Sequence, residues 1–206
     1  PPRPTLAGMA AAPFAHLHLH TEYSMLDGAA KLEPLFKEAV DLGQTSLGIT
    51  DHGYLFGAYD FYRTARKYGV KPIIGIEAYL TPGTSRRDRT RVTWGTAAQR
   101  DDDVSARGAY THATLWARDN EGLHNLMRLG SRASLEGQWG KWPRMDRELL
   151  GQYSSGLIGT TGCPSGEVQV RLRLGQYDEA LRTAGEFQDI FGSENFYVEV
   201  MDHGLE

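Results

Sequence analysis

Three histidines alternate near the start of the chain, at His16, His18 and His20. In an extended strand, side chains two residues apart point to the same face, so the three rings would share one side. Imidazole is the commonest metal ligand at neutral pH, and two such rings can bind one ion without moving the backbone. A single histidine here would be read as a half-buried core residue with satisfied hydrogen bonds. Three in one run, followed by Asp27, favour a metal site.

Four more potential ligands lie at or near the ends of later apolar runs. His52 and Cys163 directly follow such runs, Glu77 lies near the end of another, and His112 opens a fourth. A carboxylate in a buried strand needs a partner, because burying it unpaired is costly. The carboxyl ends of parallel strands in an α/β barrel meet at one mouth, where active sites form. His112 is the exception, and would need its strand to run differently or to begin earlier.

The elements that must position these residues alternate between β-rich runs and amphipathic stretches. The predicted strands are 14–20, 46–50, 71–80, 112–117, 156–160 and 196–201. The predicted helices are 32–42, 58–65, 120–132, 167–174 and 177–190. Repeated βα units of this kind predict a mostly parallel sheet in an α/β fold. The segment 81–109 lacks either period and is rich in Gly, Arg and Asp, so we expect one long surface loop there.

Length and composition limit the classes of protein. The 206 residues suit one substantial domain. A net charge of −4 argues against binding duplex DNA through a broad basic face, so any phosphate chemistry needs locally bound cations. No apolar run is long enough to span a bilayer, which argues against a membrane role.

The chain start and the lone cysteine bear on compartment and domain bounds. Residues 1–13 lack the features of a secretory signal, which predicts a cytoplasmic protein. We expect 1–13 to be disordered, with 1–8 a candidate cloning remnant before Met9, and 14–206 to form one domain. Cys163 has no internal disulfide partner, which fits a reducing compartment and leaves its thiol free for metal or packing.

Four stretches resemble one known family. The stretches FAHLHLHTEYSMLDGA, ITDHGYLFGAYDFY, KPIIGIEAYL and TGCPSGEV are similar, in order and spacing, to the motifs of the PHP domain at the N-terminus of bacterial DNA polymerase III alpha subunits, the replicative C-family DNA polymerases. The likeness runs from Phe14 to the end and includes linking segments such as NEGLHNLMRL and SLEGQWGKWPRMD. A standalone phosphoesterase would have little reason to share those links.

The resemblance implies a distorted (β/α)7 barrel of the PHP type, with up to three divalent metal ions (zinc, manganese or iron) at its mouth. Matched residue by residue, one ion would take His18 and His20, share Glu77 with a second ion that also takes His112 and Cys163, and the third would take Asp27 and His52. His16 would pack or hydrogen-bond deeper in the barrel.

The family's last two ligands, an Asp-x-His pair, have no counterpart in this chain. Asp202 and His203 are adjacent rather than separated by one residue, so we assign neither to metal. We therefore expect a barrel truncated before its last strand, binding fewer than three ions and poorly active as a nuclease.

The function that the resemblance implies is metal-dependent phosphodiester hydrolysis, as 3′–5′ exonuclease proofreading of a primer end. The parent would be a DNA-directed DNA polymerase, a nucleotidyltransferase whose polymerase site lies outside this segment. Its partners would be primer-template DNA, the rest of the polymerase chain, and the sliding clamp and clamp loader. Single-stranded DNA would be guided by four arginines of the loop 81–109, Arg86, Arg87, Arg89 and Arg91, with Trp94 as a stacking platform, unless the loop is simply a solvated charged insertion.

Two alternatives remain open. A standalone PHP phosphoesterase of the histidinol-phosphatase type would share the barrel and the metals, and turnover of histidinol phosphate without action on DNA would identify it. A non-catalytic module, in which metals only stabilise the fold and its surface binds replication partners, would also keep the ligands.

Overall fold

A mixed β-sheet forms the centre of the computed structural model, which describes residues 14–102 and 105–201. Its strands are β1 (Ser46–Ile49), β2 (Lys71–Leu80), β3 (Thr111–Ala117), β4 (Gln138–Trp139), β5 (Trp142–Met145), β6 (Leu157–Thr160) and β7 (Phe196–Tyr197). The seven-stranded sheet follows the order β4-β5-β2-β3-β6-β7, and β1 pairs with β2. Residues 1–13, which were predicted to be disordered, lie outside the described residues, as do Asp202 and His203.

Strand directions differ from the sequence-based expectation. β2 runs parallel to β1 and β5, and β6 runs parallel to β7. However, β3 is antiparallel to both of its neighbours, β2 and β6, and β4 is antiparallel to β5. The prediction of a mostly parallel sheet is therefore wrong. The strand order ends at β4 and β7, so within the described part of the chain the fold is an open mixed α/β sheet rather than a closed (β/α)7 barrel.

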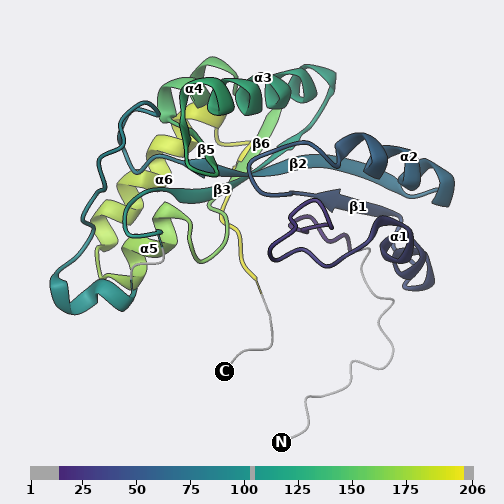
Figure 1. The fold of residues 1–206 in the computed structure, drawn as a ribbon, viewed down its shortest axis with the longest axis horizontal. Helices are drawn as coiled ribbons and strands as arrows, with labels where there is room; N and C mark the ends of the chain where they lie inside the picture. The colour runs from purple at the N-terminus through teal and green to yellow at the C-terminus, as the bar shows by residue number, and fades with distance from the viewer. Residues whose placement is uncertain (1–13, 103–104, 202–206) are drawn as a thin grey trace, which may run out of the picture.

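Helices surround this sheet (Figure 1). They are α1 (Leu32–Asp41), α2 (Ala58–Tyr68), α3 (Asn120–Glu136), α4 (Arg147–Gln152), α5 (Glu167–Arg173) and α6 (Tyr177–Phe191). Helices α1 and α2 lie beside β1, α3 and α4 lie together over the sheet, and α5 and α6 lie at the other end (Figure 1). The side chains of Asp119 and Asp146 cap α3 and α4 by accepting hydrogen bonds from the backbone N–H groups of Gly122 and Leu149, each at 2.9 Å.

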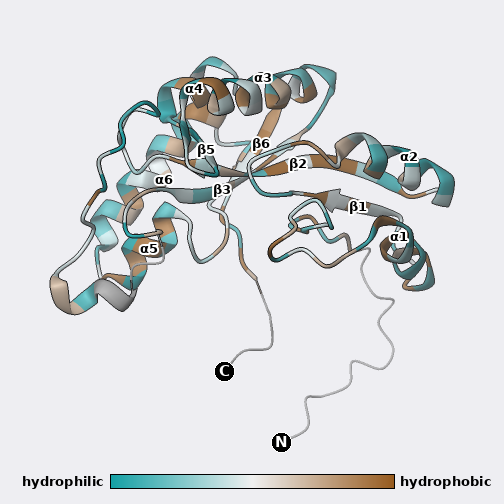
Figure 2. Ribbon diagram, viewed as in Figure 1, coloured by the Kyte–Doolittle hydropathy of each residue, from teal (hydrophilic) through white to brown (hydrophobic). Residues whose placement is uncertain are grey.

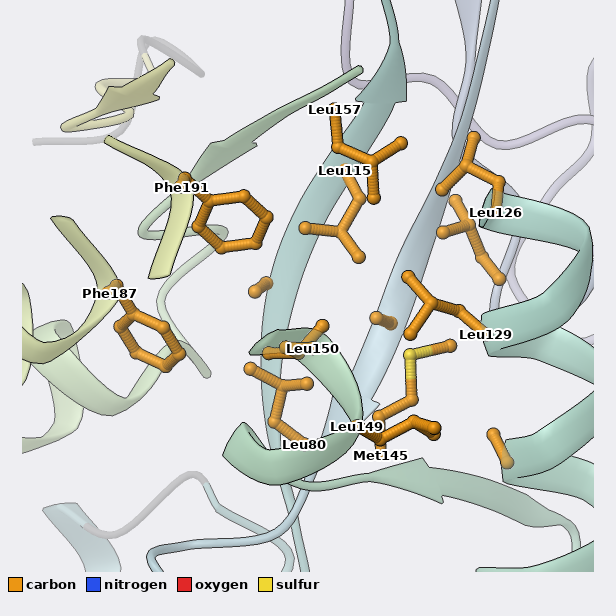
Figure 3. Close-up of a cluster of buried hydrophobic side chains, with 14 residues drawn as sticks. Leu80, Leu115, Leu126, Leu129, Met145, Leu149, Leu150, Leu157, Phe187 and Phe191 are labelled. Carbon is orange, nitrogen blue, oxygen red and sulfur yellow. The ribbon is translucent and has the colours of Figure 1, made fainter. Parts of the chain in front are cut away.

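Two hydrophobic cores hold helices against the strands, and a third cluster packs Trp94 against Val170 and Leu174 at α5. The larger joins β2, β3, β5 and β6 to α3, α4 and α6, and its side chains interdigitate between these elements (Figure 3). The smaller joins α1 and α2 to β1, with Phe36 and Phe61 fully buried and their ring centroids 4.8 Å apart. Hydrophobic residues run along β2, whereas the helices carry both hydrophobic and hydrophilic residues (Figure 2). Each fully buried side chain of this size contributes about 1.5–3 kcal/mol, so the cores hold the site-bearing strands in place.

The segment 14–20 is not a regular strand. It follows β1 through two hydrogen bonds, from the N–H of Gly48 to the carbonyl of His16 at 2.8 Å and from the N–H of Thr50 to the carbonyl of Leu19 at 2.9 Å. His16 is exposed and meets the ring of Phe14 edge-on at 4.9 Å, so its expected place deeper in the fold is wrong. Because this segment bonds to β1 only at separated points, it lacks a regular pleat, and only the rings of His18 and His20 point inward.

The segment between β2 and β3 is only partly the expected surface loop. It contains a 3-10 helix, η1 (Ala97–Asp102), and both Arg86 and Trp94 are buried. The guanidinium of Arg86 pairs with Asp146 at 2.9 Å and with Glu136 at 2.7 Å. Neither Arg86 nor Trp94 can therefore contact DNA as a surface group, which corrects that part of the interpretation.

A second arginine explains why this segment lies close to the body of the domain. Arg144 on β5 is fully buried and donates hydrogen bonds to the backbone carbonyls of Arg86, Asp88 and Ala109, at 3.2, 2.6 and 3.2 Å. A buried guanidinium requires such acceptors, so the segment supplies the partners that Arg144 needs.

In the described residues, no helix is both long enough and apolar enough to cross a membrane.

Candidate metal centre

Glu77 lies at the centre of a group of four imidazole rings. Its carboxylate is 3.3 Å from Nε2 of His18, 3.4 Å from Nε2 of His20, 2.6 Å from Nδ1 of His52 and 3.0 Å from Nδ1 of His112. The side chain of Glu77 is only 2% exposed. Four rings from three segments, the stretch 14–20, the turn after β1 and the start of β3, thus meet one buried carboxylate on β2.

The direction of β3 brings His112 to this place. Because β3 runs antiparallel to β2, its first residues lie beside the carboxyl end of β2, and His112 pairs with Tyr79. The N–H of His112 also bonds to the carbonyl of Ser165 at 3.0 Å, which holds the turn after β6 against β3. In that turn, Sγ of Cys163 lies 3.4 Å from Nδ1 of His112. The antiparallel direction of β3 therefore explains how His112, at the start of its strand, lies close to residues at or near the ends of other strands.

Asp27 lies at the solvent side of the group. One of its carboxylate oxygens is 2.7 Å from Nε2 of His52, and its side chain is 57% exposed. The turn that carries it is held by the buried Asp51, which accepts hydrogen bonds from the N–H and Oγ1 of Thr21, both at 2.7 Å, and from Oγ of Ser24 at 2.6 Å. Asp51 therefore positions Asp27 without being part of the group itself.

The electrostatics follow from burial and proximity. Burial disfavours the carboxylate of Glu77, but the close contacts with His112, His18 and His52 outweigh it and hold its pKa far below the usual range. Burial lowers the pKa of His18, and contacts with Glu199 and Glu77 more than reverse this, raising it to about 9. Burial and the charge of Glu77 raise the pKa of the Cys163 thiol to about 12. Contacts with carboxylates likewise raise the pKa of His52 against the effect of its burial, so His18 and His52 can supply positive charge beside the buried carboxylate.

Three buried atoms in this group make no hydrogen bond of acceptable geometry within the described chain: Nδ1 of His52, Oε2 of Glu77 and Nε2 of His112. Orphaned buried polar atoms are uncommon in folded proteins and call for an explanation, such as a bound ion. Three overlapping triads place their ligand atoms within 4.8 Å of one another: His18–His20–Glu77, His20–Asp27–His52 and His52–Glu77–His112. Nitrogen, oxygen and sulfur donors in this mixture suit zinc and other divalent transition metals. The residues present therefore fit a metal centre.

All seven residues singled out in the sequence lie in or beside this group, and the structure adds one that sequence reasoning missed. Glu199, two residues after β7, places Oε1 at 2.5 Å from Nδ1 of His18. Its Oε2 accepts a hydrogen bond from Oγ1 of Thr160 at 2.5 Å. The signal that singles out Glu77, a carboxylate near the end of a predicted strand, also applies to Glu199 in the predicted strand 196–201.

Comparison with known proteins gives a consistent result. The model of the PHP domain matches residues 16–203. The chain is 60% identical to a DNA polymerase III subunit alpha from Saccharopolyspora erythraea, over 94% of this chain and 17% of that protein. It is 59% identical to the one from Mycobacterium leprae, over 93% and 16%, and 47% identical to the one from Deinococcus radiodurans, over 93% and 14%.

The chain thus spans about a sixth of the length of these relatives. Among solved structures, an amidohydrolase from Chromobacterium violaceum aligns at 12% identity with a TM-score of 0.44, over 89% of this chain and 84% of that one, which is too distant to carry an argument. The family match covers nearly the whole described chain and all seven candidate ligands: this chain belongs to the PHP domain family.

Proposed function

We propose that this chain is the PHP domain of a bacterial DNA polymerase III alpha subunit, and that it hydrolyses phosphodiester bonds at the 3′ end of a DNA strand. Support for the parent protein comes from relatives of that name at 56–60% identity over 93–95% of the chain. The observation that carries the hydrolytic role is the convergence of four imidazole rings on the buried Glu77.

The ligands divide among up to three ions. His18, His20 and Glu77 would hold one, and Glu77, His112 and Cys163 a second; the third would take Asp27 and His52. The set of Glu77, His112 and Cys163 supplies three protein ligands and leaves a fourth position for solvent, as in catalytic zinc sites. Zinc, manganese and iron all accept such donors.

The charges of the site explain why cations are needed. Without them, the carboxylates of Glu77 and Asp27 would repel a phosphodiester, which is itself negative. When bound, the metal ions neutralise the phosphate oxygens and lower the pKa of a coordinated water, so that hydroxide is available near neutral pH. Glu77 is buried, whereas Asp27 is 57% exposed, so the substrate reaches the centre from the Asp27 side.

Within this proposal the hydrolysis removes mispaired nucleotides from a primer in the cytoplasm. The polymerase active site would lie elsewhere in the parent protein, and the sliding clamp and clamp loader would contact that parent rather than this domain. The exposed Arg87, Arg89 and Arg91 are the remaining candidates to guide single-stranded DNA, since Arg86 is buried.

In the test, the chain or its parent protein is incubated with Mn²⁺ or Zn²⁺ and with 5′-labelled DNA that has a mismatched 3′ end. We expect shortening from the 3′ end that chelation stops, and its loss in His18→Ala and in Asp27→Asn. The matched control is His124→Ala, because His124 is an exposed histidine on α3. In the whole parent protein the same ligand substitutions leave primer extension measurable. Equal cleavage by all variants would refute the proposal.

The same assay separates the two alternatives. Turnover of histidinol phosphate with no shortening of DNA would identify a standalone phosphatase of small molecules. Metal binding that raises thermal stability, with no hydrolysis of either substrate by the chain or its parent, would identify a metal-stabilised structural module.

A further inference from the structure

Glu199 contacts the metal centre from outside the candidate ligand set. Its Oε1 lies 2.5 Å from Nδ1 of His18, and its side chain is 11% exposed. The other carboxylate oxygen accepts the hydroxyl proton of Thr160 at 2.5 Å, and the backbone N–H of Glu199 donates to Oγ1 of Thr161 at 3.1 Å. The carboxylate is therefore fixed from the carboxyl end of β6 and has a defined orientation toward His18.

The ring of His18 lies between two carboxylates. Nε2 faces Glu77 at 3.3 Å, and Nδ1 faces Glu199 at 2.5 Å. An imidazole that ligates a metal through one nitrogen carries its proton on the other, and a carboxylate can only accept that proton in a hydrogen bond. With Glu199 in place, the proton is held on Nδ1 and the lone pair of Nε2 is directed toward Glu77.

The other site histidines differ in this respect. Nδ1 of His20 lies 3.2 Å from the hydroxyl of Ser24, and Nε2 of His52 faces Asp27, which is itself a candidate ligand. Of the carboxylates in the described chain that contact a site histidine, Glu199 is the one that lies outside the proposed ligand set. The sequence places it in the stretch YVEVM, between the exposed Val198 and Val200.

We propose that Glu199 is a positioning residue that fixes the tautomer and ring orientation of His18, so that Nε2 is presented to a divalent cation shared with Glu77. This inference rests on the proposed metal-binding function. Thr160 extends the arrangement by one step, because its hydroxyl sets the angle of the Glu199 carboxylate. Removing a hydrogen-bond partner of this kind typically weakens metal affinity by about 10- to 100-fold.

The experiment measures Zn²⁺ affinity of the 206-residue chain by competition with a chelator, for the unmodified chain, Glu199→Ala and Glu199→Gln. Glu199→Ala is expected to weaken the affinity by about 10- to 100-fold. Glu199→Gln is expected to retain most of it, because the amide oxygen still accepts the Nδ1 proton and the Thr160 hydroxyl can turn to accept from the amide. Glu194→Gln, an exposed change five residues earlier, is the control and should leave the affinity unchanged.

Thermal unfolding of the metal-free variants checks that each is folded. If Glu199→Ala does not fold, Thr160→Val takes its place, since it removes the hydroxyl that orients the carboxylate; a several-fold loss of affinity is then expected. Unchanged affinity in Glu199→Ala, or an equal loss in Glu199→Ala and Glu199→Gln, would overturn the inference while leaving the metal centre intact. Failure of the unmodified chain to bind any divalent metal would defeat the proposed function, and this inference with it.

Discussion

Nδ1 of His52 lies 2.6 Å from Oε2 of Glu77, yet the two atoms are not aligned as a hydrogen bond, and neither makes another one in the described chain. Such an arrangement is costly unless a further group satisfies both atoms, and a divalent cation does so. Each of these two residues also belongs to two of the three triads of potential ligands. The pair is thus the point at which the proposed metal sites join.

Glu77→Gln should therefore affect more than one ion. The substitution removes the carboxylate shared by two triads, so we expect the number of metal ions per chain, measured by elemental analysis after dialysis, to fall by at least one. Glu38→Gln, an exposed change on α1, is the matched control and should retain the full number. Equal metal content in the two variants would show that Glu77 is not a ligand.

Cys163 should bind metal as a thiolate even though burial and Glu77 raise its pKa to about 12. A metal ion competes with the thiol proton, so binding deprotonates a coordinating cysteine. Loading with Co²⁺ is expected to give a thiolate-to-metal charge-transfer band in the near-ultraviolet spectrum. The band should disappear in Cys163→Ala and persist in His124→Ala. A spectrum unaffected by Cys163→Ala would remove this residue from the ligand set.

Asp51→Ala should destabilise the fold even though Asp51 is not a candidate ligand. Its carboxylate is 3% exposed and accepts three hydrogen bonds from Thr21 and Ser24, so the substitution leaves buried donors unpaired. We expect the free energy of unfolding to fall by roughly 3 kcal/mol. Asp60→Ala, which removes an exposed acceptor of the Tyr23 hydroxyl, should cost about 1 kcal/mol or less. Urea titration measures the free energy of unfolding of both variants, and an equal loss in Asp51→Ala and Asp60→Ala would contradict the prediction.

The charge cluster at the end of α3 predicts a pH dependence. Hydrogen bonds from Arg132 and Arg86 lower the pKa of Glu136 from 4.5 to about 2. A carboxyl group with a lower pKa in the folded state stabilises the fold above its unfolded pKa, and this contribution is lost as the pH falls through the folded pKa. The contribution of Glu136 should therefore disappear between pH 4.5 and about 2.

The matching measurement is urea unfolding of Glu136→Gln across that range. At neutral pH the variant should unfold at a lower urea concentration than the unmodified chain, and the difference should narrow as the medium is acidified. Glu194→Gln, which is exposed and away from this cluster, is expected to unfold at the same urea concentration as the unmodified chain at both neutral and acidic pH. A gap for Glu136→Gln that does not change with pH would show that its charge is not the cause.

Strongly periodic segments of the sequence predicted their elements well. The structure has helices at all five predicted positions, and β1, β2, β3 and β6 match their predicted ranges within one residue at each end. These segments have apolar periodicities that only one kind of element can bury. The hairpin Gln138–Met145 was missed because its sequence has no continuous apolar run, and α4 was missed because six residues are too few to show a helical period.

The site was predicted as a set of residues rather than as a geometry. A position at or near a strand end singled out His52, Glu77 and Cys163, which all lie in or beside the group. The antiparallel direction of β3, which explains His112, depends on pairing between distant segments and leaves no local signal. The inward or outward direction of His16 likewise depends on where the segment bonds to β1, which alternation alone does not determine.

Anomalous X-ray scattering from crystals of the chain soaked in Zn²⁺ tests directly whether the seven candidate ligands form one metal centre. We expect a peak at about 2.0–2.3 Å from Nδ1 of His112, Sγ of Cys163 and the carboxylate of Glu77, with any further peak beside His18 and His20 or beside Asp27 and His52. Zinc peaks found only at surface sites, with none among these side chains, would contradict this expectation.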